Sequence, residues 1–214
     1  MSSLINVGAT EDEQRATRPA RCTLNIAHLI LVFAIVCLSS CSEKKGAAPK
    51  SFYNIDSLVT IQVQKLKGSE LTKSVEIDSK SEQTKFVPDS AQWASELEIF
   101  RQLAQVNKAA FRDAYVVSDT RDTNSNLTVR EIKAQREVPV SMVRLYYLRT
   151  PADLRRVEAT FVEENTLYTN TRKMVMELQR YNNVNLLHRY RIESLQKFIM
   201  DDSVRFTIAG EVGI

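Results

Sequence analysis

From residue 114 onward, apolar and polar residues alternate with a period of two, and this pattern limits the folds open to the chain. A period of two places successive side chains on opposite faces of a β-strand, whereas a helix repeats every 3.6 residues. The polar separators between the alternating segments are short, which requires antiparallel neighbours. We expect strands over residues 115–117, 127–134, 140–148, 154–162, 167–178, 186–192, 197–200 and 204–212.

The alternation also predicts that one face of this sheet meets water. In the segment RVEATF, residues 156–161, charged or polar residues alternate with apolar ones. Antiparallel sheets commonly bury one face and expose the other. The neighbours Tyr146 and Tyr147 must then point to opposite faces if their strand is regular.

The segment before residue 114 has helical and hairpin patterns. Apolar residues at helical spacing predict helices over 51–67 and 90–107, and the Trp93 and Phe100 side chains should pack the second helix onto the sheet. Two short strands, 74–78 and 83–87, should form a hairpin between them. The predicted class is α+β: two N-terminal helices packed on a C-terminal antiparallel β-sheet, a meander, with a curved half-barrel left open as a variant.

The N-terminal region has the form of a secretion signal. Three arginines precede an apolar run, but the uninterrupted part, residues 29–38, is short of the roughly 20 residues that span a bilayer. Small residues, Ser39 and Ser40, follow the run, as signal processing requires. Residues 1–40 are therefore predicted to be a signal peptide.

The tetrad Leu38-Ser39-Ser40-Cys41 resembles the lipobox of bacterial lipoproteins. The resemblance implies cleavage between Ser40 and Cys41 and attachment of a diacylglycerol to the Cys41 thiol, so that a lipid anchor ties the protein to a membrane. A secretory signal with a chance cysteine and an uncut signal anchor remain alternatives. Residues 41–50, with Gly46 and Pro49, read as a flexible tether, and residues 51–214 as one α+β domain.

A second, shorter resemblance concerns residues 93–100 and 107–115. These segments look like part of uncharacterised bacterial outer-membrane lipoproteins, and the likeness carries no functional residues over. Together with the lipobox, it implies a lipid-anchored protein of the outer membrane, facing the periplasm or the cell surface.

Cysteine and histidine are too scarce in the domain for several kinds of site. Cys22 and Cys37 would leave with the signal peptide and Cys41 would carry lipid, so the domain keeps no free thiol. His188 is its one histidine. The sequence therefore predicts no Cys/His metal site, and it shows no motif for a cofactor.

Catalytic motifs are equally scarce. The chain contains no G-x-S-x-G, P-loop or G-x-G-x-x-G pattern. His188 could serve as the base of a hydrolase, but it reads more simply as a cross-strand residue on the same face as Tyr190. The acidic pairs 163–164 and 201–202 fall in expected turns, where they would be solvated. We therefore expect a protein that is not an enzyme.

The mild net charge of +3, without a dense run of Lys or Arg, does not favour a nucleic-acid partner. The sequence thus predicts an anchored envelope lipoprotein with a non-enzymatic binding or assembly role toward another envelope protein. The alternative is a carrier or receptor for lipid or lipoprotein, with a half-barrel cavity lined by aromatic side chains. Those aromatic residues are Tyr146, Tyr147, Phe161, Tyr168, Tyr190, Phe198 and Phe206.

Overall fold

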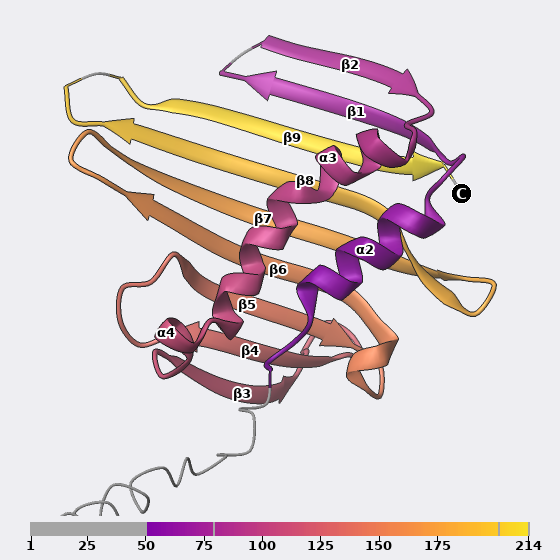
Figure 1. Ribbon diagram of the computed structural model, residues 1–214, viewed down its shortest axis with the longest axis horizontal. Helices are drawn as coiled ribbons and strands as arrows, with labels where there is room; N and C mark the ends of the chain where they lie inside the picture. Colours follow the sequence, from indigo (N-terminus) through magenta and orange to yellow (C-terminus); the bar gives the residue numbers. More distant parts are fainter. Residues whose placement is uncertain (1–50, 79, 201, 214) are drawn as a thin grey trace, which may run out of the picture. The chain divides into compact units, whose positions relative to one another are not determined.

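The computed structural model describes residues 51–214, apart from 79, 201 and 214. The predicted signal peptide, the tether and Cys41 lie outside the described residues. Nine strands form one antiparallel sheet in the order β2-β1-β9-β8-β7-β6-β5-β4-β3, with helices across one face (Figure 1). The strands are β1 (Glu70–Ile77), β2 (Lys80–Phe86), β3 (Tyr115–Arg121), β4 (Thr128–Ala134), β5 (Val140–Tyr147), β6 (Leu154–Glu164), β7 (Tyr168–Tyr181), β8 (Val184–Phe198) and β9 (Val204–Gly213).

The helical elements are short. They are α2 (Ile55–Lys65), α3 (Ser90–Arg101), the 3₁₀ segment η1 (Gln102–Asn107), α4 (Ala109–Arg112) and the 3₁₀ turn η2 (Pro151–Asp153). The Asn54 side chain caps α2 by accepting from the Ser57 amide, and Asp89 forms a capping box with Gln92 at the start of α3. Gly68, with φ of +85°, lies just after α2 in the left-handed region that glycine adopts at low cost.

The predicted antiparallel sheet is confirmed, but the arrangement of two N-terminal helices before it is wrong. Among the described residues only α2 precedes the first strand, and α3 lies between β2 and β3 in the chain. The hairpin β1–β2 is part of the sheet, because β1 pairs with β9 along its whole length. This long-range pairing supplies hydrogen-bond partners to β9, which would otherwise be an edge strand.

The sheet is an open one, with β2 and β3 as its edges. The seven strands β3 to β9 follow one another as a meander, and β1–β2 extends it beyond β9. The two strands predicted at 186–192 and 197–200 are one strand, β8. Its hairpin with β7 turns through Asn182 and Asn183, both at positive φ, as tight hairpin turns require.

The core lies between the helices and the sheet. Trp93, Leu97 and Phe100 of α3 are buried there, as their spacing predicted. In α2, the buried Gln62 side chain accepts from the Leu187 amide at 2.8 Å and donates to the Asn185 carbonyl at 3.1 Å. These two bonds fix α2 to β8 beside an irregularity in that strand.

Candidate binding face of the sheet

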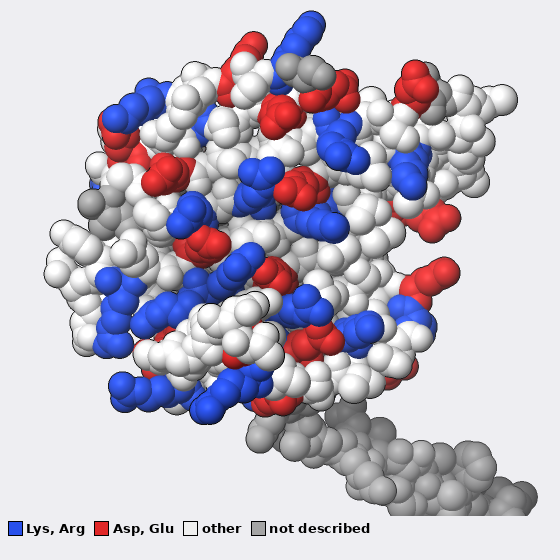
Figure 2. Space-filling model, turned by 180° about the vertical axis from the view of Figure 1, so that it is seen from behind, with Lys and Arg blue, Asp and Glu red and all other residues white. Residues whose placement is uncertain are grey.

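The face of the sheet opposite the helices carries the candidate site, and we call it the open face. Figure 2 views the molecule from this side, where Lys and Arg side chains are interspersed with Asp and Glu across the strands. Cross-strand pairing aligns residues of all nine strands in one row there. The row runs Ser118, Glu131, Arg144, Glu158, Val175, Arg191, Ala209, Ser74 and Gln83.

Ion pairs join many open-face side chains over the middle strands. Arg144 Nε lies 2.6 Å from a Glu131 oxygen, and Arg189 Nε lies 2.7 Å from a Glu177 oxygen. Tyr146 belongs to the same surface, since its hydroxyl donates to Glu158 at 2.8 Å. Burial raises the pKa of Tyr146, and the bond to Glu158 adds to that effect. The predicted split of Tyr146 and Tyr147 to opposite faces is confirmed, because the Tyr147 side chain is buried.

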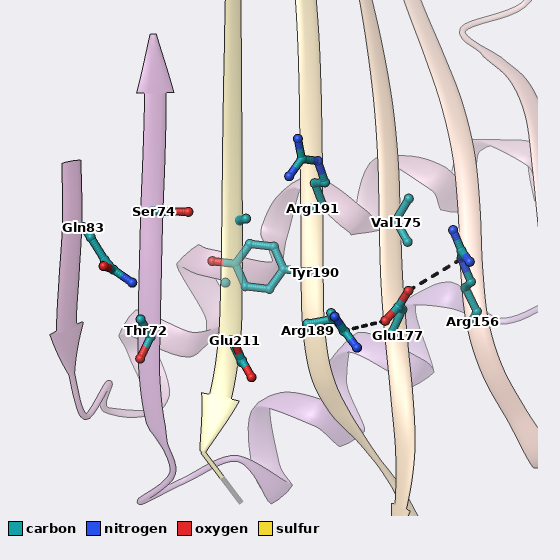
Figure 3. A pocket seen from close by; sticks show the side chains of 12 residues that line it. Thr72, Ser74, Gln83, Arg156, Val175, Glu177, Arg189, Tyr190, Arg191 and Glu211 are labelled. Carbon is teal, nitrogen blue, oxygen red and sulfur yellow. Dashed lines mark ion pairs between the residues drawn. The ribbon is translucent and has the colours of Figure 1, made fainter. Parts of the chain in front are cut away.

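A groove of about 390 Å³ crosses the open face over β8, β9 and β1 (Figure 3). Small residues leave this space, because β9 contributes Ala209 and Gly210 and the adjoining β1 contributes Thr72 and Ser74. Its remaining lining residues are Gln83, Arg156, Val175, Glu177, Arg189, Tyr190, Arg191 and Glu211.

The two walls of the groove differ in how their polar groups are satisfied. On the β6–β8 side, Glu177 lies between Arg189, at 2.7 Å, and Arg156, at 3.9 Å (Figure 3). On the opposite side, neither Glu211 nor Gln83 has a side-chain hydrogen bond or ion pair with another described residue. The β9–β1–β2 wall therefore offers a carboxylate and an amide to a binding partner.

Gly210 makes room for the Tyr190 ring beside the groove. It pairs with Tyr190, and a Cβ atom placed on it would lie 2.2 Å from Tyr190 Cε1. The absence of a side chain lets the tyrosine ring lie across β9 (Figure 3).

On the helix side of β9, the Tyr190 hydroxyl donates to Glu96 of α3. Both Glu96 oxygens also lie 2.8 Å from Lys73 Nζ of β1. Burial raises the pKa of Tyr190, and the bond to the Glu96 carboxylate raises it further. The three side chains join α3 to both strands that flank β9.

His188, the histidine considered in the sequence analysis as a catalytic base, lies outside the groove. His188 lies where β8 departs from regular pairing with β7, between Leu187, which pairs with Leu178, and Arg189, which pairs with Glu177. The alternation that would place it on the face of Tyr190 is broken there, since Leu187 and Tyr190 are both buried. It is not among the residues that line the groove.

Glu163 and Glu164 do not share a site with His188, because they pair with the start of β7 whereas His188 lies opposite the end of that strand. Glu163 is engaged by Arg172, whose guanidinium lies 2.7 Å away, and by the Tyr168 hydroxyl at 3.1 Å. Asp201, like Ser40 and Cys41, lies outside the described residues. Among the seven aromatic residues of the predicted cavity, Tyr147, Phe161 and Tyr190 are buried and Phe198 is exposed.

Within the part of the chain that the structure describes, no group of three or more His, Cys, Asp or Glu side chains is placed to hold a metal ion. Over the same residues, no helix is both long and apolar enough to cross a membrane.

The sequence did not reveal the groove itself. It showed that alternate residues of each strand are polar, but the groove depends on β1 pairing with β9, which brings Ser74 beside Ala209. Only that long-range contact places the small side chains of β1 and β9 next to one another. Comparison with known proteins found no matching family model, no matching curated protein and no matching solved structure.

Proposed function

We propose that this chain is an envelope lipoprotein, anchored at the outer membrane through Cys41, whose domain holds another envelope protein against its open face. The role is non-enzymatic binding or assembly. The observation that carries the proposal is the groove over β8, β9 and β1, with one wall satisfied by its own ion pairs and the other left with unpaired polar groups.

The chemistry of the groove indicates the kind of partner. The Glu211 carboxylate and the Gln83 amide can accept hydrogen bonds, and the Ser74 and Thr72 hydroxyls can donate or accept them. A partner segment with a basic side chain opposite Glu211 and polar groups opposite β1 would satisfy this wall. On the other wall Arg189 and Arg191 are already paired with Glu177 and Glu193, so that wall would add no preference for a charged side chain.

The carrier alternative finds less support. The space between the helices and the sheet is filled by buried side chains, among them Trp93, Leu97, Phe100, Met174 and Met176. The hollows over β7, β8 and β9 lie on the polar face instead. A lipid could enter the apolar layer only if α2 and α3 moved away from the sheet.

Site-specific photocrosslinking in the native envelope tests the binding proposal. A photoreactive amino acid replaces Gln83 in the groove, and Ile61, exposed on α2, is the matched control position. We expect one protein adduct from position 83 that is absent from position 61, and we expect Glu211→Lys to abolish it. Equal adducts from both positions, or an adduct indifferent to Glu211→Lys, would show that the groove is not the binding site.

The anchor has a separate test. Cys41→Ser should move the protein from the membrane fraction to the soluble fraction after a high-salt wash. Full retention on the membrane after that wash would mean that Cys41 does not carry the anchor.

A further inference from the structure

The two edge strands of the sheet differ in how they are protected from pairing with another chain. β2, at one edge, has the sequence KSEQTKF, with lysines near both ends and a single apolar residue that is partly buried. β3, at the other edge (Figure 1), carries the neighbours Val116 and Val117, which are 54 % and 41 % exposed. It contains no lysine or proline and pairs with β4 without a bulge. Those are the usual devices that keep an edge strand from pairing, so β3 is open to a further strand.

Alternate residues of β3 turn their backbone groups away from the sheet. At one end of the β3–β4 pair the Ala114 carbonyl accepts from the Gln135 amide at 2.7 Å, and at the other end the Asp122 amide donates to β4 at 2.9 Å. The register between these ends is unbroken, and bonded and non-bonded positions alternate in an antiparallel pair. Even-numbered residues of β3 therefore bond to β4. The outward N–H and C=O groups belong to the odd-numbered residues, Tyr115, Val117, Asp119 and Arg121.

A second copy of β3 would satisfy all of these groups in one antiparallel register. In this register Ser118 lies on a two-fold axis, opposite Ser118 of the other copy. Val117 then comes opposite Asp119 of the other copy, and Tyr115 comes opposite Arg121. Every outward residue of one strand meets an outward residue of the other, as an antiparallel ladder requires.

The two neighbouring registers that keep the same faces together fit less well. With Val117 on the axis, Arg121 would come opposite Asp113, which lies before the strand and has helical backbone angles. With Asp119 on the axis, two aspartates would lie directly opposite each other, where like charges are destabilising.

The charges at the edge also suit the register centred on Ser118. Arg121 has no ion pair with a described residue of its own chain. It would come diagonal to Asp113 of the other copy, whose side chain is 79 % exposed, and long side chains reach across such a diagonal. The two Asp119 carboxylates would also be diagonal to each other, but Arg130 of the same chain holds each of them through two bonds of 2.8 Å.

We propose that two copies of this chain pair through β3, so that the sheet of one copy continues into the sheet of the other. The interface is antiparallel and two-fold symmetric, with Ser118 on its axis and the open faces of both copies on the same side. Its affinity comes from backbone hydrogen bonds, and its register is set by the side chains of β3. The groove over β8, β9 and β1 lies away from β3 in the strand order, so the proposal does not depend on a partner there.

Disulfide formation between copies tests this pairing. The experiment uses the full chain with its own cysteines replaced by Ser, at Cys22, Cys37 and Cys41. In Ser118→Cys the two introduced thiols would occupy a non-hydrogen-bonded pair, whose Cα atoms lie about 4.5 Å apart, within the range of a disulfide. Ser81→Cys, on the opposite edge strand β2, is the matched control.

Under mild oxidation, Ser118→Cys should form a covalent dimer at least about tenfold faster than Ser81→Cys, because paired thiols have a high effective concentration. A mixture of Val116→Cys and Thr120→Cys chains checks the register, since these two positions face each other across the axis and neither faces its own copy. The mixture should crosslink more than either chain alone. Equal rates at positions 118 and 81, or a mixture no better than its components, would overturn the proposal.

Val117→Lys tests the pairing without an introduced thiol, by giving β3 the residue type that protects β2. Sedimentation equilibrium should show a dimer for the parent chain, and the variant should have a dissociation constant raised by more than about tenfold. Association through another part of the chain would not respond to this change. Circular dichroism checks that the variant is folded, as expected for a substitution at a partly exposed edge position. A folded variant that dimerises like the parent would contradict the proposal, and a monomeric parent chain would leave the edge to a strand of a different protein.

Discussion

Strands β7 and β8 present two unlike faces built from alternate residues of the same segments. On the covered face, Met174, Met176 and Ile192 are at most 2 % exposed. On the open face, the side chains of Arg189 and Arg191 are 62 % and 54 % exposed. Apolar burial contributes about 25 cal/mol per Å² removed from water, whereas an exposed ion pair contributes about 0–1 kcal/mol. Stability should therefore come mainly from the covered face.

The largest expected effect is the loss of the Trp93 side chain from the covered face. Trp93 is fully buried between α3 and the sheet, so Trp93→Ala should lower the free energy of unfolding by about 3–5 kcal/mol. Urea denaturation measures this change. The matched open-face variant, Gln83→Ala, should stay within about 0.5 kcal/mol of the parent protein. Equal losses from both variants would contradict the assignment of stability to the covered face.

Trp93→Phe, a more conservative change, separates the effect of packing from that of hydrogen bonding at this position. The Trp93 indole nitrogen is buried without a hydrogen-bond partner among the described residues. Trp93→Phe should therefore lose packing volume but no hydrogen bond, and cost less than Trp93→Ala.

The next largest effect is expected at Gly210, which lies against the Tyr190 ring. In Gly210→Ala the new methyl group must displace the Tyr190 ring, which also breaks the bond to Glu96. We expect a loss of about 1–3 kcal/mol by urea denaturation. Ala209→Ser, on the open face of the same strand, is the control and should be nearly neutral. Combining Gly210→Ala with Tyr190→Leu should cost less than the sum of the single changes, because the clash is removed.

The contribution of Tyr190 to the free energy of unfolding should depend on pH. Tyr190→Phe should lower the free energy of unfolding at neutral pH by about 1–3 kcal/mol, because Glu96 loses a donor. The folded-state pKa of Tyr190 is raised by burial, above the value near 10 of an unfolded chain. Its stabilising contribution is therefore complete below about pH 10 and falls as the pH rises further.

The parent protein should thus lose stability faster than Tyr190→Phe above pH 10, in urea melts compared at matched pH. Lys73 forms an ion pair with Glu96, the carboxylate that accepts from the Tyr190 hydroxyl. Lys73→Met should therefore be compared with Tyr190→Phe in the same melts. Parallel pH curves for the parent and Tyr190→Phe would show that Tyr190 does not titrate as its burial implies.

The difference between the faces also explains what the sequence could and could not reveal. The alternation in residues 156–161 predicted the burial of Val157, Ala159 and Phe161, because period two is a local property of a strand. The spacing of Trp93 and Phe100 likewise predicted the buried side of α3. Both features depend on neighbours a few residues apart in the chain.

Features that depend on distant pairing were missed. The partnership of β1 with β9 joins residues near 70 to residues near 213, and no local pattern specifies it. The irregularity in β8 between Leu187 and Arg189 shifted the expected face of His188, and its stabilising contact is Gln62, more than a hundred residues earlier. The groove needs the first of these pairings, so its residues could not be assembled from the sequence.

The smallest expected effect lies on the open face and separates binding from stability. Arg189→Gln removes the ion pair with Glu177, at 2.7 Å, but both side chains are partly solvated. The free energy of unfolding should fall by less than about 1 kcal/mol, and the difference should shrink in high salt. Leu187→Ala, two residues earlier on the covered face, should cost about 2–5 kcal/mol. If Arg189→Gln leaves stability intact but weakens the photocrosslink at position 83, the groove is a binding surface; a large stability loss would instead make Arg189 part of the framework.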